Sequence, residues 1–306
     1  MPLITLIRKN PDEKIYFMIA SLHALTTMRD PEALRTNIHE LAKLYIAMLR
    51  HAWIDESTIC IFDQARVPAH GRAEWILACL THMGFMERMH AYKDASAKGK
   101  AWQTSVGTFC YPILQAVDVL LYNTTHVPVW KDQKQHIEFA RDIAQKVNSN
   151  FWDVFVVPEP MIQEDVATIP WLDGQKMSKS YNNFIWLQED EKTIRKKVAR
   201  IPTAAIAIDE PKNPDEDNVY ALWKLFLDPE QDKTVRERYI AWGLSYKQAK
   251  QELADAIVNL TSAIQAQYQS VSDTEVDLML KATAKEATIV SDIVYAKLHA
   301  AMGFTL

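Results

Sequence analysis

"KIYFMIAS" (residues 14–21) and "STICIF" (57–62) are two short runs rich in apolar and β-favouring side chains. The segment between them, "DPEALRTNIHELAKLYIAMLRHA" (30–52), is predicted to be a helix, with Asp30 as N-cap and Pro31 at the first helical position. Two strands joined by a helix of crossover length are typical of a parallel pair. The sequence therefore predicts an α/β fold with a doubly wound, Rossmann-like parallel sheet.

A third strand is predicted at "HVPV" (126–129). Further helices are expected at 69–83, 108–123 and 132–148. In such sheets, ligands lie outside the carboxyl ends of the strands. His23 follows the first predicted strand, and Asp132 and Gln133 follow the third, so we expect all three near a ligand.

The pattern changes after about residue 187. Residues 202–218 carry three prolines and a group of acids, which indicates an irregular connection. Beyond it, Ser245 with Gln248 and Ser272 with Glu275 have the spacing of capping boxes. An apolar stripe at helical spacing follows, made of Leu253, Ile257, Leu260 and Ile264. We expect a Rossmann-like domain at 1–187 and an all-helical domain at 188–306.

Composition limits the classes of function. The chain has 306 residues, a net charge of −5 and no apolar run near the roughly 18 residues that span a bilayer, so no membrane partner is expected. Cys60, Cys79 and Cys110 lack metal-ligand spacing; we expect reduced core thiols, a cytoplasmic protein and no structural metal. Only seven glycines occur, and neither G-x-G-x-x-G nor the P-loop motif is present. Dinucleotide and P-loop enzymes are therefore disfavoured.

The segment "TFCYPILQAVDVLLYN" (108–123) is an apolar helix with one polar stripe. Tyr111, Gln115 and Asp118 are spaced by four and seven residues, which places them within about 60° of each other on a helix. Such a stripe faces either water or a pocket. The neighbours of Asp118 are apolar on every side, which favours a pocket.

The segment "DGQKMSKSYNN" (173–183) predicts a mobile loop. Lys176 and Lys179 are close enough in sequence to reach one anion, and Ser178 and Ser180 add hydroxyl donors. For an arbitrary pair of lysines, a solvated surface would be the simpler interpretation.

Here the pentapeptide KMSKS (176–180) resembles the signature loop of class I aminoacyl-tRNA synthetases. The pattern Y-P-x-L-x-A-x-D (111–118) is similar to the amino-acid-binding helix of the tryptophanyl-tRNA synthetases. Three further segments match that family in its order: "LHALTT" (22–27), "RVPAH" (66–70) and "VPVWKDQKQHIEFARDIAQKVN" (127–148).

The resemblance implies ATP-dependent activation of L-tryptophan to tryptophanyl-adenylate and its transfer to tRNA(Trp), with Mg²⁺, by a homodimer. The helical domain would bind the tRNA anticodon. Lys176 and Lys179 would be catalytic, stabilising the pyrophosphate leaving group. Asp118 would accept the indole N–H. The rest of the tryptophan pocket would be His23 on its wall, Tyr111, Gln115 and Gln133 at the ammonium group, and Val127 and Val129 against the ring. The ATP site would comprise Trp130, Asp132, Lys176, Met177, Ser178 and Lys179.

Two departures from the family bear on activity. The His-x-Gly-His-like signature, which the resemblance places before residue 1, is absent, so we expect the nucleotide half of the site to be incomplete. Trp130 stands where the family has glycine, a residue used for close approach to the backbone. An indole at this position is expected to compete with the adenosine.

Two alternatives follow. One is a regulatory, tryptophan-binding paralogue without synthetase activity. The other is a tyrosyl-type synthetase, because Tyr-x-x-x-Gln-x-x-Asp also resembles that family's pocket; "DQKQH" (132–136) favours tryptophan. The basic segment "KTIRKKVAR" (192–200) is either a solvated helix face or a contact to tRNA phosphates.

Overall fold

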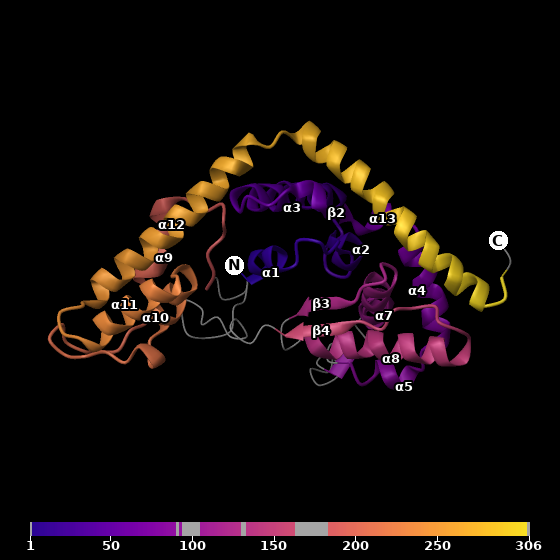
Figure 1. Ribbon diagram of the computed structural model, residues 1–306, viewed down its shortest axis with the longest axis horizontal. Coiled ribbons are helices and arrows are strands. Elements are labelled where there is room, and N and C mark those ends of the chain that lie inside the picture. The colour runs from indigo at the N-terminus through magenta and orange to yellow at the C-terminus, as the bar shows by residue number, and fades with distance from the viewer. Residues whose placement is uncertain (1, 90–91, 94–104, 130–132, 163–182, 305–306) are drawn as a thin grey trace. The chain divides into compact units, whose positions relative to one another are not determined.

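Two parallel strands, β1 (Ile15–Ile19) and β2 (Ile59–Asp63), pair in register from Ile15↔Ile59 to Ile19↔Asp63. Helix α3 (Pro31–His51) joins them, and its N-cap Asp30 accepts hydrogen bonds from the amides of Glu32 and Ala33. The predicted strand–helix–strand unit is confirmed. The computed structural model describes residues 2–89, 92–93, 105–129, 133–162 and 183–304 (Figure 1).

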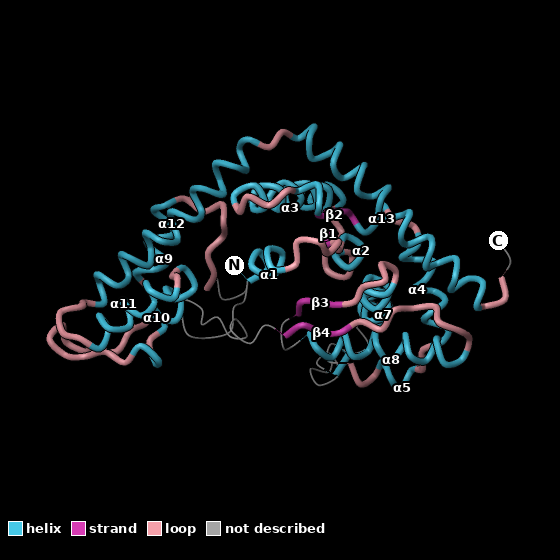
Figure 2. The backbone as a smooth tube through the Cα atoms, in the orientation of Figure 1, coloured by secondary structure: helices cyan, strands magenta, loops and turns pink. Residues whose placement is uncertain are grey.

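A second parallel pair consists of β3 (His126–Val129) and β4 (Glu159–Ile162), with α8 (Lys134–Asn150) between them in sequence (Figure 2). The sequence predicted β3 but not β4. The reason is local: Pro158 and Pro160 weaken the strand signal, because proline cannot donate to a strand ladder.

The chain folds into two compact units. The sheet unit contains Leu3–Glu164 and Val271–Leu306, and the helical unit contains Met1–Pro2 and Asp165–Ser270. Besides the elements above, the sheet unit contains α1 (Pro2–Lys9, whose first residue clusters with the helical unit), α2 (Ser21–Ala24), α4 (Ala69–Leu80), α5 (Met83–Met86), α7 (Val106–Leu120), α13 (Asp273–Ala301) and the 3₁₀ turns η1 (Glu56–Thr58) and η2 (Gln64–Arg66).

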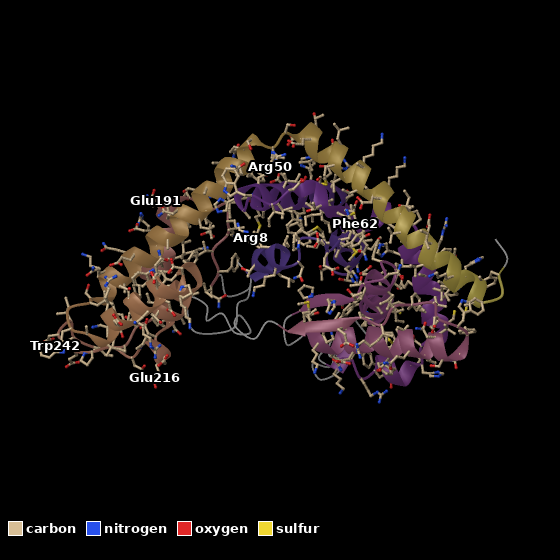
Figure 3. All side chains as sticks on the ribbon, in the orientation of Figure 1. Arg8, Arg50, Phe62, Glu191, Glu216 and Trp242 are labelled. Atoms are coloured by element: carbon tan, nitrogen blue, oxygen red, sulfur yellow. The ribbon has the colours of Figure 1, made fainter. Side chains whose placement is uncertain are left out.

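The main core of the sheet unit lies between β2, α4, α7, α8 and α13. Phe62 of β2, labelled in Figure 3, is fully buried there, together with Leu120 of α7 and Phe139 of α8. This core positions the carboxyl end of β2 beside α4 and α7, where the polar residues of the site lie.

The helical unit contains α9 (Glu191–Ala199), α10 (Asn218–Trp223), α11 (Pro229–Ile240), α12 (Tyr246–Ser270) and the 3₁₀ turns η7 (Pro214–Glu216) and η8 (Lys224–Phe226). All its described regular elements are helical, as the sequence predicted. Its core gathers around Tyr239, Val198 and Leu253, which are all buried. Ser245 Oγ accepts the amide of Gln248, the first half of a predicted capping box.

Helix α13 does not cluster with the helical unit, although the expected domain at 188–306 included it. Its buried positions Val276, Leu280 and Ala287 pack against α3, α4 and β2. The hydroxyl of Thr283 donates to the carbonyl of Ile61 in β2 at 2.5 Å. A pattern of helical periodicity gives the buried face of a helix but not its partner, so this assignment required the structure.

No helix in the described part of the chain is long and apolar enough to cross a membrane. The described cysteines are free; Cys60 is buried, whereas Cys79 is exposed and does not belong to the predicted core.

Candidate active site

The polar stripe predicted on residues 108–123 lies on α7, which begins after Ser105, whose hydroxyl accepts the amide of Thr108. Tyr111 and Gln115 are half-buried. The side chain of Asp118 is only 6% exposed. The carboxylate at the centre of the predicted pocket is therefore inside the sheet unit and needs internal partners.

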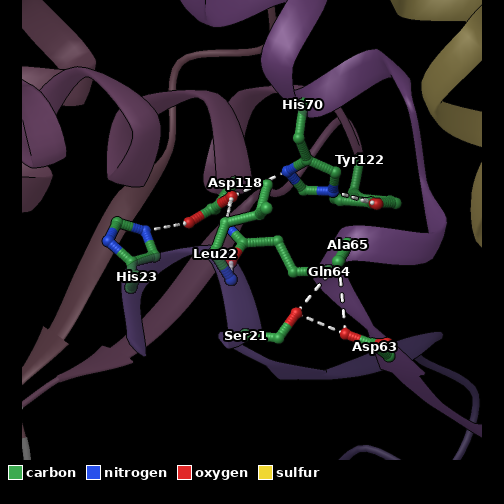
Figure 4. A network of polar contacts seen from close by, with 9 residues as sticks. All are labelled: Ser21, Leu22, His23, Asp63, Gln64, Ala65, His70, Asp118 and Tyr122. Carbon is green, nitrogen blue, oxygen red and sulfur yellow. Dashed lines mark hydrogen bonds and ion pairs between the residues drawn. The ribbon is translucent and has the colours of Figure 1, made fainter. Parts of the chain in front are cut away.

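Asp118 receives three hydrogen-bond donors (Figure 4). Its Oδ1 atom lies 2.7 Å from Nδ1 of His70 and 2.6 Å from Nε2 of Gln64, and its Oδ2 atom lies 2.7 Å from Nε2 of His23. Burial by itself raises the pKa of Asp118, but the hydrogen bonds from His23 and His70 outweigh burial and hold the pKa below its ordinary value. The site therefore contains a buried carboxylate that is ionised at neutral pH.

The carboxyl ends of β1 and β2 supply two of these donors. Ser21, just after β1, donates from its hydroxyl to Asp63, the last residue of β2. The side chain of Asp63 also caps η2 by accepting the amide of Ala65. This link holds α2, which carries His23, beside η2, which carries Gln64. The two loops therefore meet at the strand ends, where ligands of parallel sheets bind.

Tyr111 lies at one side of this group. Its hydroxyl is 3.0 Å from Nε2 of His136 on α8, and its ring is 6.1 Å from that of His23. The structure thus brings together three of the predicted tryptophan-site residues, His23, Tyr111 and Asp118. The other described ones are half-buried: Gln115 on α7, Val127 and Val129 on β3, and Gln133 at the N-cap of α8.

Gln64, His70 and Glu74 were not predicted as site residues. His70 occurs in the quoted segment "RVPAH", and Gln64 follows directly after a predicted strand, so both carried a usable signal. Glu74 lies one turn after His70 on α4. Burial raises the pKa of Glu74, the charge of His23 lowers it and the charge of Asp118 raises it further, so Glu74 belongs to the electrostatic surroundings of the site.

The predicted nucleotide-site residues, Trp130, Asp132, Lys176, Met177, Ser178 and Lys179, lie outside the described residues. Across the ranges that are described, no group of three or more His, Cys, Asp or Glu side chains could hold a metal ion.

Comparison with known proteins gives a consistent result. Residues 1–262 match the family model for class I tRNA synthetases of the tryptophan and tyrosine type. The chain is 39% identical over 303 residues to the tryptophan–tRNA ligase of Caldanaerobacter subterraneus, covering 96% of this chain and 90% of that protein. It is 35% identical to the tryptophan–tRNA ligase of Rhodopirellula baltica, covering 92% and 88%.

Among solved structures, the chain is similar to tryptophanyl-tRNA synthetase from Campylobacter jejuni, crystallised with ADP and tryptophan. The TM-score is 0.84 and the identity 33%, covering 98% of this chain and 93% of that one. These relatives favour the tryptophanyl over the tyrosyl alternative for the chain as a whole. The chain belongs to the class I aminoacyl-tRNA synthetases and, within them, to the tryptophan–tRNA ligases.

Proposed function

We propose that this tryptophan–tRNA ligase binds its amino acid at Asp118, activates it with ATP to tryptophanyl-adenylate and transfers it to tRNA(Trp). The observation that carries the proposal is the buried, ionised Asp118 at the strand ends, surrounded by His23, Gln64 and His70. The bound ADP and tryptophan of the Campylobacter jejuni relative support ATP and tryptophan as the ligands.

The carboxylate has an acceptor position to offer. Two carboxylate oxygens provide about four lone-pair sites. Oδ1 takes two described donors, Gln64 and His70, whereas Oδ2 takes one, His23. The indole N–H of tryptophan would fill the remaining position on Oδ2. Phenylalanine has no donor for it, and a site built to bind such a donor rejects an analogue without it by about 10⁴- to 10⁵-fold.

In the first reaction step, the tryptophan carboxylate attacks the α-phosphorus of ATP and the bond to pyrophosphate breaks. In the second, a terminal ribose hydroxyl of the tRNA attacks the acyl carbon and AMP leaves. We assign Lys176 and Lys179 to neutralising the charge that develops on pyrophosphate. Mg²⁺, when bound, would add positive charge at the phosphates of ATP. Trp130, Asp132, Met177 and Ser178 would complete the nucleotide site.

The tRNA would contact the exposed face of α9. Lys192, Lys196 and Arg200 are exposed and spaced by four residues, so they share one face. Their neighbours are engaged elsewhere: Arg195 pairs with Glu191 and Asp255, and Lys197 with Glu189. Three cations on one face suit backbone phosphates. We further propose that the helical domain binds the anticodon, that the protein is a homodimer and that it acts in the cytoplasm.

A second candidate function is a tryptophan-binding paralogue that does not activate the amino acid. Trp130 is the observation that favours it, because an indole in place of glycine would occupy space needed by adenosine. Both candidates require the tryptophan pocket, and only the first requires ATP.

Thermal stability tests the pocket. Tryptophan should raise the melting temperature of the chain and phenylalanine should not. Asp118→Ala should abolish the shift, whereas Asp142→Ala, at an exposed position on α8, should retain it. Equal stabilisation by tyrosine would assign the pocket to that amino acid instead, and no stabilisation by tryptophan would refute the proposal.

A further inference from the structure

A chain of hydrogen bonds leads from Asp118 into the core of the sheet unit (Figure 4). Nδ1 of His70 lies 2.7 Å from Oδ1 of Asp118, and Nε2 of the same imidazole lies 2.8 Å from the hydroxyl of Tyr122. His70 is completely buried and Tyr122 is 6% exposed. Both side chains therefore lie inside the sheet unit, and His70 connects the Tyr122 hydroxyl to Asp118.

The chemistry of the three groups sets the direction of the hydrogen bonds. An ionised carboxylate only accepts, so Nδ1 of His70 carries the hydrogen that points to Asp118. A neutral imidazole carries a hydrogen on only one ring nitrogen, so a neutral ring that donates from Nδ1 to Asp118 has none on Nε2. Nε2 is then an acceptor, and the Tyr122 hydroxyl donates to it. Tyr122 thus selects the tautomer of His70 that can donate to Asp118.

The second donor to Oδ1 is held in the same manner. Nε2 of Gln64 donates to Oδ1, while Oε1 of the same amide accepts the backbone N–H of Leu22 at 3.0 Å. Each donor to Oδ1 is therefore oriented by a further hydrogen bond, one from the main chain and one from Tyr122. Among the described residues, His23 is the only hydrogen-bond donor to Oδ2. The ring of His23 in turn lies beside that of Tyr111, which belongs to the same polar stripe of α7 as Asp118.

We propose that His70 and Tyr122 are positioning residues for tryptophan specificity: Tyr122 fixes the tautomer of His70, and His70 saturates Oδ1 so that Oδ2 is the oxygen that receives the indole N–H. This inference rests on the proposed function, in that it requires Asp118 to bind the indole. It adds two residues that make no contact with the substrate.

Packing around Tyr122 allows a conservative test. Its ring lies 4.9 Å from that of Tyr16 and 5.2 Å from that of Phe62, between ring centroids. Tyr122→Phe keeps this ring contact and removes only the hydroxyl. Tyr16→Phe is the matched control, because it removes a hydroxyl from the neighbouring ring, outside the chain from Asp118 to Tyr122.

The measurement compares two ligands by calorimetry: tryptophan and its isostere with benzothiophene in place of indole, which lacks the N–H. The dissociation constant of the isostere divided by that of tryptophan gives a ratio that reports how much the indole N–H contributes to binding. This ratio does not depend on ATP. Leaving a buried acceptor without its donor corresponds to a change of about 5- to 150-fold, so Tyr122→Phe should lower the ratio by a factor in that range. Tyr16→Phe should leave the ratio at the wild-type value.

Two His70 variants separate positioning from a merely structural role. His70→Asn places an amide N–H near the position of Nδ1, so it should lower the ratio of dissociation constants only in part. His70→Leu offers no donor and should lower the ratio further. In the wild-type protein, side-chain ¹⁵N shifts of His70 should show a neutral ring protonated on Nδ1. A doubly protonated or Nε2-protonated ring would overturn the inference, even if the variants fail to fold.

The outcomes distinguish this inference from the proposed function. If Asp118→Ala leaves the ligand ratio unchanged, Asp118 does not bind the indole and the proposed pocket fails. If Asp118→Ala brings the ratio of dissociation constants to about one while Tyr122→Phe does not change it, the pocket stands and the role of Tyr122 is refuted.

Discussion

The Nε2 atom of His23 lies 2.7 Å from Oδ2 of Asp118, although the two residues are 95 positions apart in sequence. His23 and His70 are the two donors that lower the pKa of Asp118 against the effect of burial. His23 approaches the oxygen that we assign to the indole, so it both keeps the carboxylate charged and limits the space beside it.

The first prediction concerns His23 and pH. The ordinary pKa of the Asp118 carboxyl group is 3.8, and its pKa in the folded protein is lower. The group therefore stays charged at pH values above 3.8 and loses its charge only as the pH falls through the lowered pKa. His23→Leu removes one donor and should raise the pKa of Asp118. Tryptophan affinity, titrated from pH 7 downward, should then fall at a higher pH than in the wild type. His126→Leu, at an exposed position on β3, serves as control. An unshifted acid limb would contradict the prediction.

The second prediction concerns Glu74. Its pKa is raised above the ordinary 4.5, first by burial. A folded protein that holds this proton more tightly than the unfolded chain loses stability as the pH rises above 4.5. Glu74→Gln removes the charge and should raise the melting temperature at pH 7–8, with little effect at pH 4. Glu87→Gln, at an exposed position, should have no effect at either pH. A lower melting temperature for Glu74→Gln at pH 7–8 would show that its charge is stabilising.

The third prediction concerns Lys176 and Lys179. Charges that act on a leaving group stabilise the transition state, so replacing either lysine by alanine should slow adenylation by about 10²- to 10³-fold. The dissociation constant for tryptophan should hardly change. Lys281→Ala, on the exposed face of α13, is the control for loss of a surface charge. Pyrophosphate exchange that ignores both substitutions would show that the loop is not catalytic.

The fourth prediction concerns Trp130. Trp130→Gly should tighten ATP binding, because the indole no longer competes with adenosine. Titration calorimetry with ATP on the two proteins measures the effect. Tight ATP binding by the unsubstituted chain, together with rapid tryptophan-dependent pyrophosphate exchange, would show that the nucleotide site tolerates Trp130.

The fifth prediction concerns the attachment of α13. Thr283 Oγ1 donates to the carbonyl of Ile61 in β2, whereas Thr288 Oγ1 contacts only its own helix in the described bonds, at the carbonyl of Ala284. Thr283→Val should lower the free energy of unfolding by about 1 kcal/mol more than Thr288→Val does. Chemical denaturation of both variants measures the difference, and equal losses would show that the bond to β2 contributes nothing.

Local sequence signals predicted much of the fold. Asp30 and Pro31 marked the start of α3, and β-rich runs marked β1 and β2. The proline-containing β4 gave no such signal. The partner of α13 also stayed unpredicted, because one buried helical face fits many surfaces.

The site was predicted in part for a related reason. Asp118 stands out in an apolar helix, so its buried position could be predicted from its neighbours. His70 lies in a segment that resembles the family, and Gln64 follows a predicted strand. The role of each nevertheless depends on a hydrogen bond to Asp118, which is 48 positions from His70 and 54 positions from Gln64 in sequence. Such contacts follow from the meeting of two strand ends, which only the folded chain displays.

The return of α13 to the sheet unit has a consequence during translation. Asp165–Ser270 lies between the two segments of the sheet unit, so the ribosome releases this part of the helical unit before α13 is made. Until then, the side of β2 that α13 covers, including Cys60, lacks its final cover. The sheet unit is therefore complete only once α13 itself has been synthesised. Incompletely covered strands of this kind are surfaces that chaperones protect.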